Sequence, residues 1–283
     1  MTKLSDPKEK KQRVIPGFGL SMGITLFMLS GFIIIPLASV LVYSFQLSPR
    51  EFINLITKTN VVNAFKTSLL CSVFAAFVNS VFGLILAWVL VRYEFPGKRI
   101  MDGLIELPFA LPTAVAGITL SKLYSDTGIM GRFLGLLGIK AAYTKTGLTI
   151  ALIFIGIPFV VRSIQPVLKT LDPRYEEAAA ILGAGKFYTF RRVILPELGP
   201  ALLTGFGLAF ARGVGEYGSV IYISGNNARD QTQVVSYVIT QKLNYLDYPG
   251  ATAIALVLLF LSFLVLLFVN MIQVHQAKRT SSL

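Results

Sequence analysis

The sequence predicts an all-α membrane protein with six transmembrane helices. Of its 283 residues, 54% are hydrophobic and 14% are charged, whereas soluble domains carry about 25% charged residues. The apolar residues are concentrated in six runs that contain no Asp, Glu, Lys or Arg, at residues 17–49, 67–91, 107–121, 146–161, 198–211 and 248–277. Because about 20 apolar residues cross a bilayer as one helix, each run indicates one span.

The third and fifth runs are the shortest of the six. The third begins directly after Glu106 and is interrupted by Pro108 and Pro112, and the fifth stops at Arg212 before continuing through Gly-rich sequence to about residue 225. Interrupted helices are tolerated in a bilayer where they line a cavity or pack against other helices. We therefore expect both runs to be irregular spans of one transmembrane domain.

The distribution of Lys and Arg predicts the orientation of the chain. Six spans put both tails, residues 1–16 and 275–283, on the same side of the membrane, with residues 17–274 forming the transmembrane domain. That side holds 16 of the 26 Lys and Arg residues, the opposite side holds 9, and Arg212 lies within the membrane. The positive-inside rule then places both tails in the cytoplasm. This orientation signal accounts for the net charge of +12, so no nucleic-acid partner is expected.

The polar loop at residues 162–197 connects the fourth and fifth runs on the predicted cytoplasmic side. Asp172 suits a helix N-cap, and Pro173 suits the first helical position, where its missing N–H costs nothing. The helix that follows carries an apolar stripe at helical spacing, formed by Tyr175, Ala178, Ala179 and Leu182. A helix with one apolar face, projecting into water, is typical of a docking element.

A turn and a second short helix are expected after that stripe. Gly183 and Gly185 can adopt the positive φ that ends a helix and redirects the chain. Phe190 and Ile194 then lie on one side of an amphipathic segment that we expect to end at Pro196. The predicted element is therefore a helix, a glycine turn and a second helix.

The spacing within this loop is also specific. An EAA triplet is followed after three residues by a glycine, and after nine more by a β-branched residue and a Leu-Pro pair: these are Glu177, Ala178, Ala179, Gly183, Val193, Leu195 and Pro196. The pattern resembles the EAA motif of permease subunits of ABC importers, with Val193 in place of the usual isoleucine. The resemblance implies that the loop is a coupling helix that docks on a separate ATPase subunit.

Arg212 and Glu216 are the charged residues deepest in the predicted spans. They are four residues apart and share a face if the segment is helical. Charges at this depth usually pair with one another or face a watery path. An internal ion pair and a contact in the translocation path both remain open, and we favour the ion pair.

No cofactor, metal site or catalytic site is predicted. Cys71 and His275 are the only residues of their types, so a structural zinc site or a Cys-His catalytic pair is not expected. The glycines at 213, 215 and 218 match a dinucleotide-binding pattern, but they follow an apolar helical run instead of a strand. We therefore expect a transport subunit and not an enzyme.

Two further segments carry a narrower resemblance. The residues LPFALPTAVAG at 107–117 and the block at 212–225 are similar to the T-type subunit of sulfate/thiosulfate ABC importers, and residues 17–272 fit that subunit throughout. The resemblance implies an inner-membrane complex with a related W-type permease, two ATP-binding subunits and an extracytoplasmic sulfate-binding protein. The implied location is the bacterial cytoplasmic membrane, with a plastid membrane also open.

Two alternatives to this function remain. A permease for molybdate or another oxyanion would have the same architecture. A proton-coupled secondary transporter is the second alternative, because Glu106, Glu216 and the broken helices could carry protons and substrate.

Overall fold

The computed structural model describes residues 18–172 and 174–280, and within them every element of regular structure is a helix. The whole predicted N-terminal tail at 1–16, Pro173 and residues 281–283 of the predicted C-terminal tail lie outside the described residues. The predicted all-α fold is confirmed.

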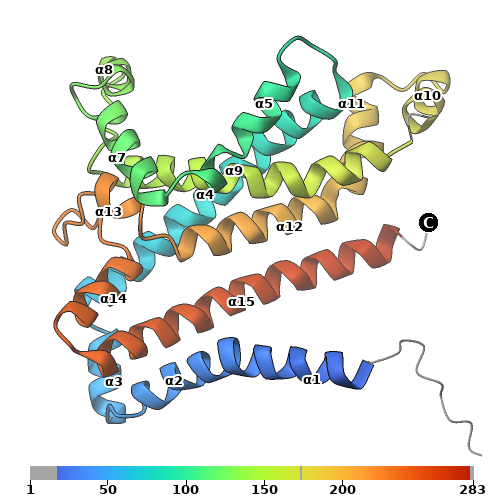
Figure 1. The fold of residues 1–283 in the computed structure, drawn as a ribbon. Helices are drawn as coiled ribbons and strands as arrows, with labels where there is room; N and C mark the ends of the chain where they lie inside the picture. Colours follow the sequence, from blue (N-terminus) through green and yellow to red (C-terminus); the bar gives the residue numbers. More distant parts are fainter. Residues whose placement is uncertain (1–17, 173, 281–283) are drawn as a thin grey trace, which may run out of the picture.

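The helices follow one another with short connections. In chain order they are α1 (Phe18–Leu29), the π-helix η1 (Ser30–Ile34), α2 (Ile35–Ser44), α3 (Pro49–Ile56), α4 (Thr59–Arg92), α5 (Lys98–Ile105), α6 (Leu107–Ala110), α7 (Thr113–Tyr124), α8 (Ile129–Leu136), α9 (Lys145–Thr170), α10 (Arg174–Ile181), α11 (Lys186–Thr189), the π-helix η2 (Phe190–Ile194), α12 (Leu195–Val214), α13 (Val220–Ile223), α14 (Val235–Asn244) and α15 (Tyr248–Thr280). Figure 1 shows the long helices running between two ends of the molecule, with the α10–α11 loop and the end of α15 at the same end.

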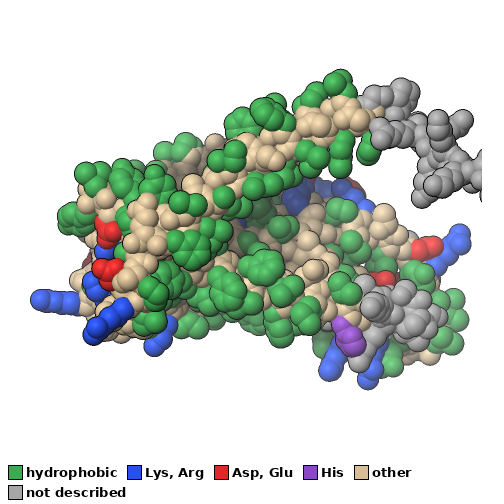
Figure 2. All heavy atoms as spheres, turned by 90° about the horizontal axis from the view of Figure 1, so that it is seen from below, with side chains coloured by type: hydrophobic (Ala, Val, Ile, Leu, Met, Phe, Trp, Pro, Cys, Tyr) green, Lys and Arg blue, Asp and Glu red, His purple; other side chains and the backbone are tan. Residues whose placement is uncertain are grey.

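Five traverses are long and apolar enough to cross a membrane. Among the described residues they are Phe18–Ser44, Thr59–Arg92, Lys145–Thr170, Lys186–Val214 and Tyr248–His275. Figure 2 shows hydrophobic side chains over much of the visible face between the two ends, and most of the visible charged side chains toward the ends. This distribution suits a protein whose middle is surrounded by hydrocarbon.

The third expected span is not a single helix. Residues 98–124 form the three short helices α5, α6 and α7, which meet near the middle of α9 in Figure 1. The chain breaks before Pro112 because Leu111 is extended, with φ −85° and ψ 134°, and a residue that precedes proline is driven out of the helical region. The sequence located this traverse correctly but not its division into three pieces.

The fifth traverse begins earlier than expected. Helical structure runs without a break from Lys186 through η2 to Val214. The prediction that a short helix ends at Pro196 was wrong, because Pro196 lies inside this continuous helical run, directly after the π-helix η2. Membrane helices tolerate such a proline where a local π-helical adjustment accommodates it. The expected continuation to residue 225 was also wrong, since α12 ends at Val214 and α13 is a separate turn of helix.

The core is formed where α4, α9 and α12 approach one another closely. Val160 of α9 is fully buried and lies between a glycine of α4 and a glycine of α12. A Cβ atom added at Gly83 would lie 2.7 Å from Cγ1 of Val160, and one added at Gly205 would lie 2.8 Å from its Cα. Small residues at helix contacts are the usual means of close packing in membranes, where water does not drive helices together.

This packing predicts that Gly205→Ala destabilises the folded chain. The added methyl group would overlap the backbone of Val160, and overpacking of this kind costs about 1–3 kcal/mol. The thermal midpoint of the purified protein in mild detergent should fall. Gly23→Ala in α1 is the matched control, because a Cβ there meets nothing within 4 Å; equal midpoints for the two variants would contradict the packing argument.

Candidate functional site

The α10–α11 loop is built by two local caps. Asp172 Oδ1 accepts a hydrogen bond of 2.9 Å from the backbone N–H of Arg174, which satisfies an otherwise free donor at the start of α10. At the other end, Gly183 has φ +80°, and the N–H of Ala184 donates to the carbonyl of Ala179 at 2.9 Å. This is the left-handed glycine termination that stops a helix. The positive φ predicted for Gly183 is confirmed, whereas Gly185 has φ −68° and does not need to be glycine for its backbone conformation.

The loop is attached to the end of α4 by polar and aromatic contacts. Arg92 Nη2 lies 2.8 Å from Glu176 Oε1 of α10, and the Arg92 guanidinium lies 5.6 Å from the centroid of the Trp88 ring. Trp88 in turn packs edge-to-face on Phe190, with centroids 5.6 Å apart. Ile194 is buried below them. A cavity of about 440 Å³ remains between the end of α4 and the loop.

The outer surface of the loop is apolar and exposed. We use the name loop patch for five side chains that are between 58% and 87% exposed, namely Tyr175, Ile181, Leu182, Phe187 and Tyr188. Of the predicted motif residues, Glu177, Ala178, Gly183 and Pro196 are exposed, and Ala179, Val193 and Leu195 are half-buried. Contiguous exposed apolar groups at a polar end of a protein usually form an interaction surface. The loop therefore has the surface of a docking element held firmly to the transmembrane helices.

The other predicted pair, Arg212 and Glu216, forms an ion pair at the opposite end of α12. Arg212 Nη1 lies 2.5 Å from Glu216 Oε2; the Glu216 side chain is 2% exposed and that of Arg212 is 35% exposed. Glu216 lies beyond the end of α12, so the pair forms across a turn and not along a helical face. The second oxygen, Oε1, accepts hydrogen bonds from the backbone N–H and the hydroxyl of Ser219, at 2.8 and 2.9 Å.

Glu216 therefore connects three elements. Its side chain joins α12 to the start of α13, and its backbone carbonyl accepts a hydrogen bond of 2.7 Å from Ser236 Oγ of α14. Every carboxylate oxygen of this buried group has a partner, which is what a buried charge requires. We call Arg212, Glu216, Ser219 and Ser236 the Glu216 node.

A second ionic cluster was missed by the sequence analysis. Arg162, assigned to the loop at 162–197, lies inside α9, where its Nη1 is 2.9 Å from Asp102 Oδ1 and its Nη2 is 2.6 Å from Glu106 Oε1. Gln165 also donates a hydrogen bond of 3.0 Å to Asp102. This cluster ties α5 and the α5–α6 junction to α9. Glu106 was recognised as unusual, but no spacing rule pairs it with a residue 56 positions away.

Comparison with known proteins identifies the family to which this chain belongs. Residues 79–282 match the family model described as binding-protein-dependent transport system inner membrane component. The chain belongs to this family. Relatives include the sulfate transport system permease proteins CysT of Salmonella typhimurium and Escherichia coli, which are 47% and 46% identical over 95% of this chain and 96% of theirs. The CysT protein of Synechocystis sp. is 43% identical over 88% of this chain and 87% of its own.

A solved structure supports the fold of this family member. The chain resembles a subunit of a bacterial ABC transporter involved in the import of the acidic polysaccharide alginate, with a TM-score of 0.76 at 17% identity over 92% of this chain and 96% of the other. At this identity the likeness establishes the fold alone. Family membership confirms the prediction of an integral membrane transport component that is not itself an enzyme.

The ion pair at the node predicts an asymmetric response to mutation. Arg212→Gln leaves the buried Glu216 charge unpaired, for which the cost in buried pairs is about 3–5 kcal/mol. Glu216→Gln should be milder, because Arg212 is partly exposed and a glutamine oxygen still accepts hydrogen bonds from Ser219. The double variant should recover membrane abundance, as measured by immunoblotting of isolated membranes. If all three variants are normally abundant and uptake is lost only without Arg212, the pair acts on the substrate instead.

Proposed function

We propose that this chain is the membrane-spanning permease subunit of an ATP-driven ABC importer that translocates sulfate or thiosulfate. The observation that carries the proposal is the 47% and 46% identity, across almost the whole chain, to two proteins named as sulfate transport permeases. Similarity that covers 95% of the chain includes most of the broken third traverse, the α10–α11 loop and the Glu216 node.

The geometry supports an external motor. The loop patch exposes about five large apolar side chains at one end of the molecule, and the loop is continuous with α12, whose other end holds the node. A partner that moves the loop would therefore move a single helical segment reaching across the membrane. This arrangement favours an ATPase-driven importer over a proton-coupled secondary transporter, which needs no such docking element.

The partners follow from the proposed mechanism. A sulfate dianion cannot cross hydrocarbon unaided, and we propose that a second, W-type permease chain completes its path. Two ATP-binding subunits would dock on the two permease loops, and an extracytoplasmic binding protein would deliver the substrate. The motif residues Glu177, Ala178, Ala179, Gly183, Val193, Leu195 and Pro196 are assigned to ATPase coupling.

Reconstitution tests the function directly. The complete complex, purified and inserted into proteoliposomes with its binding protein, should accumulate radiolabelled sulfate when ATP is supplied on the side of the loop. Excess unlabelled thiosulfate should compete and molybdate should not. Uptake driven by a proton gradient without ATP, or a preference for molybdate, would overturn the proposal.

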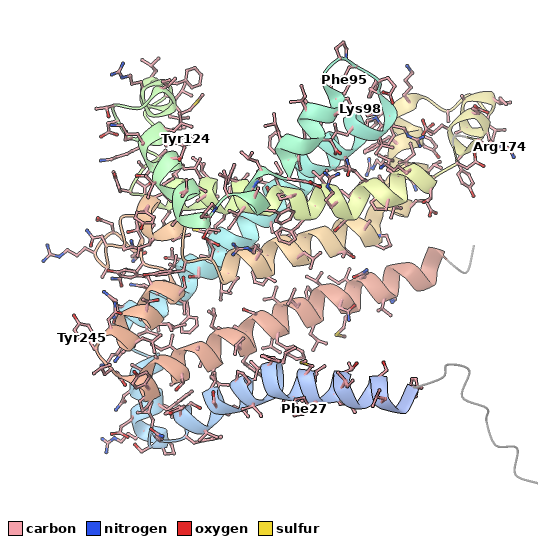
Figure 3. All side chains as sticks on the ribbon, viewed as in Figure 1. Phe27, Phe95, Lys98, Tyr124, Arg174 and Tyr245 are labelled. Carbon is pink, nitrogen blue, oxygen red and sulfur yellow. The ribbon has the colours of Figure 1, made fainter. Side chains whose placement is uncertain are left out.

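We also propose that both tails and the α10–α11 loop face the cytoplasm. The loop and the end of α15 lie at the same end of the molecule (Figure 1), and Figure 3 places Arg174 at this end and Tyr245 at the other. In a Cys71→Ala background, the variant Lys186→Cys should resist a membrane-impermeant thiol reagent in intact cells. Lys140→Cys, on the opposite side, should react. The reverse labelling pattern would refute this orientation.

The glycine turn predicts a matched pair of coupling variants. Gly183→Val forces a β-branched residue into φ +80°, a conformation that costs such a residue at least 1–2 kcal/mol. The assembled complex should then lose its ATPase subunits, or hydrolyse ATP without sulfate uptake. Gly185→Val is the control, because its φ of −68° suits any residue and a Cβ there meets nothing within 4 Å. Equal sulfate uptake by the two variants would remove the turn from the mechanism.

A further inference from the structure

A second cavity lies at the loop end of the molecule, beside the Arg162 cluster and apart from the loop patch and the Glu216 node. It has a volume of about 690 Å³ and is enclosed by the end of α4, the start of α5 and the last turns of α9. Figure 3 shows Phe95 and Lys98, which both line it, at the tip of the connection between α4 and α5. In the proposed orientation, this cavity opens at the cytoplasmic surface of the membrane.

The lining of this cavity carries more positive than negative side chains. The lining contains Lys98, Arg99 and Lys169 together with two carboxylates, Glu94 and Asp102. Glu94 is bound to Lys98 at 2.7 Å, and Asp102 is bound to Arg162 and Gln165. Within the described part of the chain no salt bridge engages Arg99 or Lys169, although Lys169 lies near enough to Asp102 to interact with it electrostatically. Both cations can therefore still contact an anion in the cavity.

Much of the remaining cavity lining is apolar and consists of Leu90, Val91, Phe95 and Ile100. The apolar surface continues from Ile100 along α5 to Met101 and Leu104. These three side chains are 70%, 38% and 58% exposed. A small inorganic anion would make no contacts with these apolar side chains. A molecule with an anionic headgroup and hydrocarbon chains can bind both the cations and the apolar surface.

We propose that this cavity binds the headgroup of an anionic phospholipid from the cytoplasmic leaflet, with its phosphate between Arg99 and Lys169 and an acyl chain along Ile100 and Leu104. Basic pockets between transmembrane helices at the cytoplasmic surface commonly bind such headgroups. A lipid here would contact α4, α5 and α9 together. It would therefore stabilise the broken third traverse, where α5, with eight residues, is too short to span the membrane by itself.

The test uses the whole transporter complex in nanodiscs of phosphatidylcholine with or without phosphatidylglycerol. Phosphatidylglycerol should raise the thermal midpoint of the wild-type complex, and native mass spectrometry should detect it as a retained lipid. The double variant Arg99→Gln, Lys169→Gln should lower this retention about 30-fold, the factor expected for two charges at about 1 kcal/mol each. The control Arg132→Gln, Lys140→Gln removes two cations at the opposite end and should leave retention unchanged.

Two results would overturn the proposal. The first is equal phosphatidylglycerol retention by the wild-type and cavity variants. The second is a full thermal shift with inorganic phosphate in phosphatidylcholine, because a free anion would then be sufficient.

A photoactivatable phosphatidylglycerol with a diazirine in its acyl chain gives an independent measurement on the unmodified complex. Crosslinks should map to residues 98–105, and crosslinks confined to other helices would contradict the assignment. Because the crosslinking experiment uses the wild-type complex, it tests lipid binding in this cavity even if the charge substitutions impair assembly. The proposal fails independently of the proposed function, since sulfate uptake is measured in a separate assay.

Discussion

The close contact of α9 with α4 and α12 is the constraint on which the rest of the structure depends. Val160 fits between Gly83 and Gly205, and neither glycine position can hold even a methyl group without movement of its neighbour. In hydrocarbon, helices gain nothing from excluding water, so contact must come from close packing of this kind. Since α9 enters the α10–α11 loop and α12 leaves it, fixing these two helices against each other also fixes both ends of the loop.

This constraint explains how the loop can be exposed and yet well defined. An isolated eight-residue helix such as α10 is unstable in water, and the loop patch contributes little burial within this chain, since its side chains are between 58% and 87% exposed. The ends of the loop are held by α9 and α12, and its middle is held by the ion pair between Arg92 and Glu176. The apolar side chains of the patch are therefore presented on a rigid base, which reduces the entropy lost when a partner binds.

The sequence was most informative where a local rule determines the structure. The apolar runs located the five long traverses and the region of the broken third one, Asp172 was recognised as a cap, and Gly183 as a positive-φ terminator. The same rules failed at Pro196, because a membrane helix can accommodate a proline as well as end at one, and tertiary context decides between the two outcomes. The cluster of Arg162 with Asp102 and Glu106 could not be predicted at all, since its members are brought together only when α5 packs on α9.

The pairing of charges within the spans bears on how an anion can pass. Arg162 is paired with two carboxylates and Arg212 with one, so under the proposed function neither arginine would offer an uncompensated positive charge to sulfate. A free guanidinium in a low-dielectric path would bind sulfate strongly and hold it there, whereas conduction requires binding weak enough for release. A paired arginine can still attract an anion in the path, while its carboxylate partner weakens the binding of that anion. Under the proposed function, selectivity is then best placed outside the membrane, in the proposed binding protein, which would bind the substrate tightly before delivery.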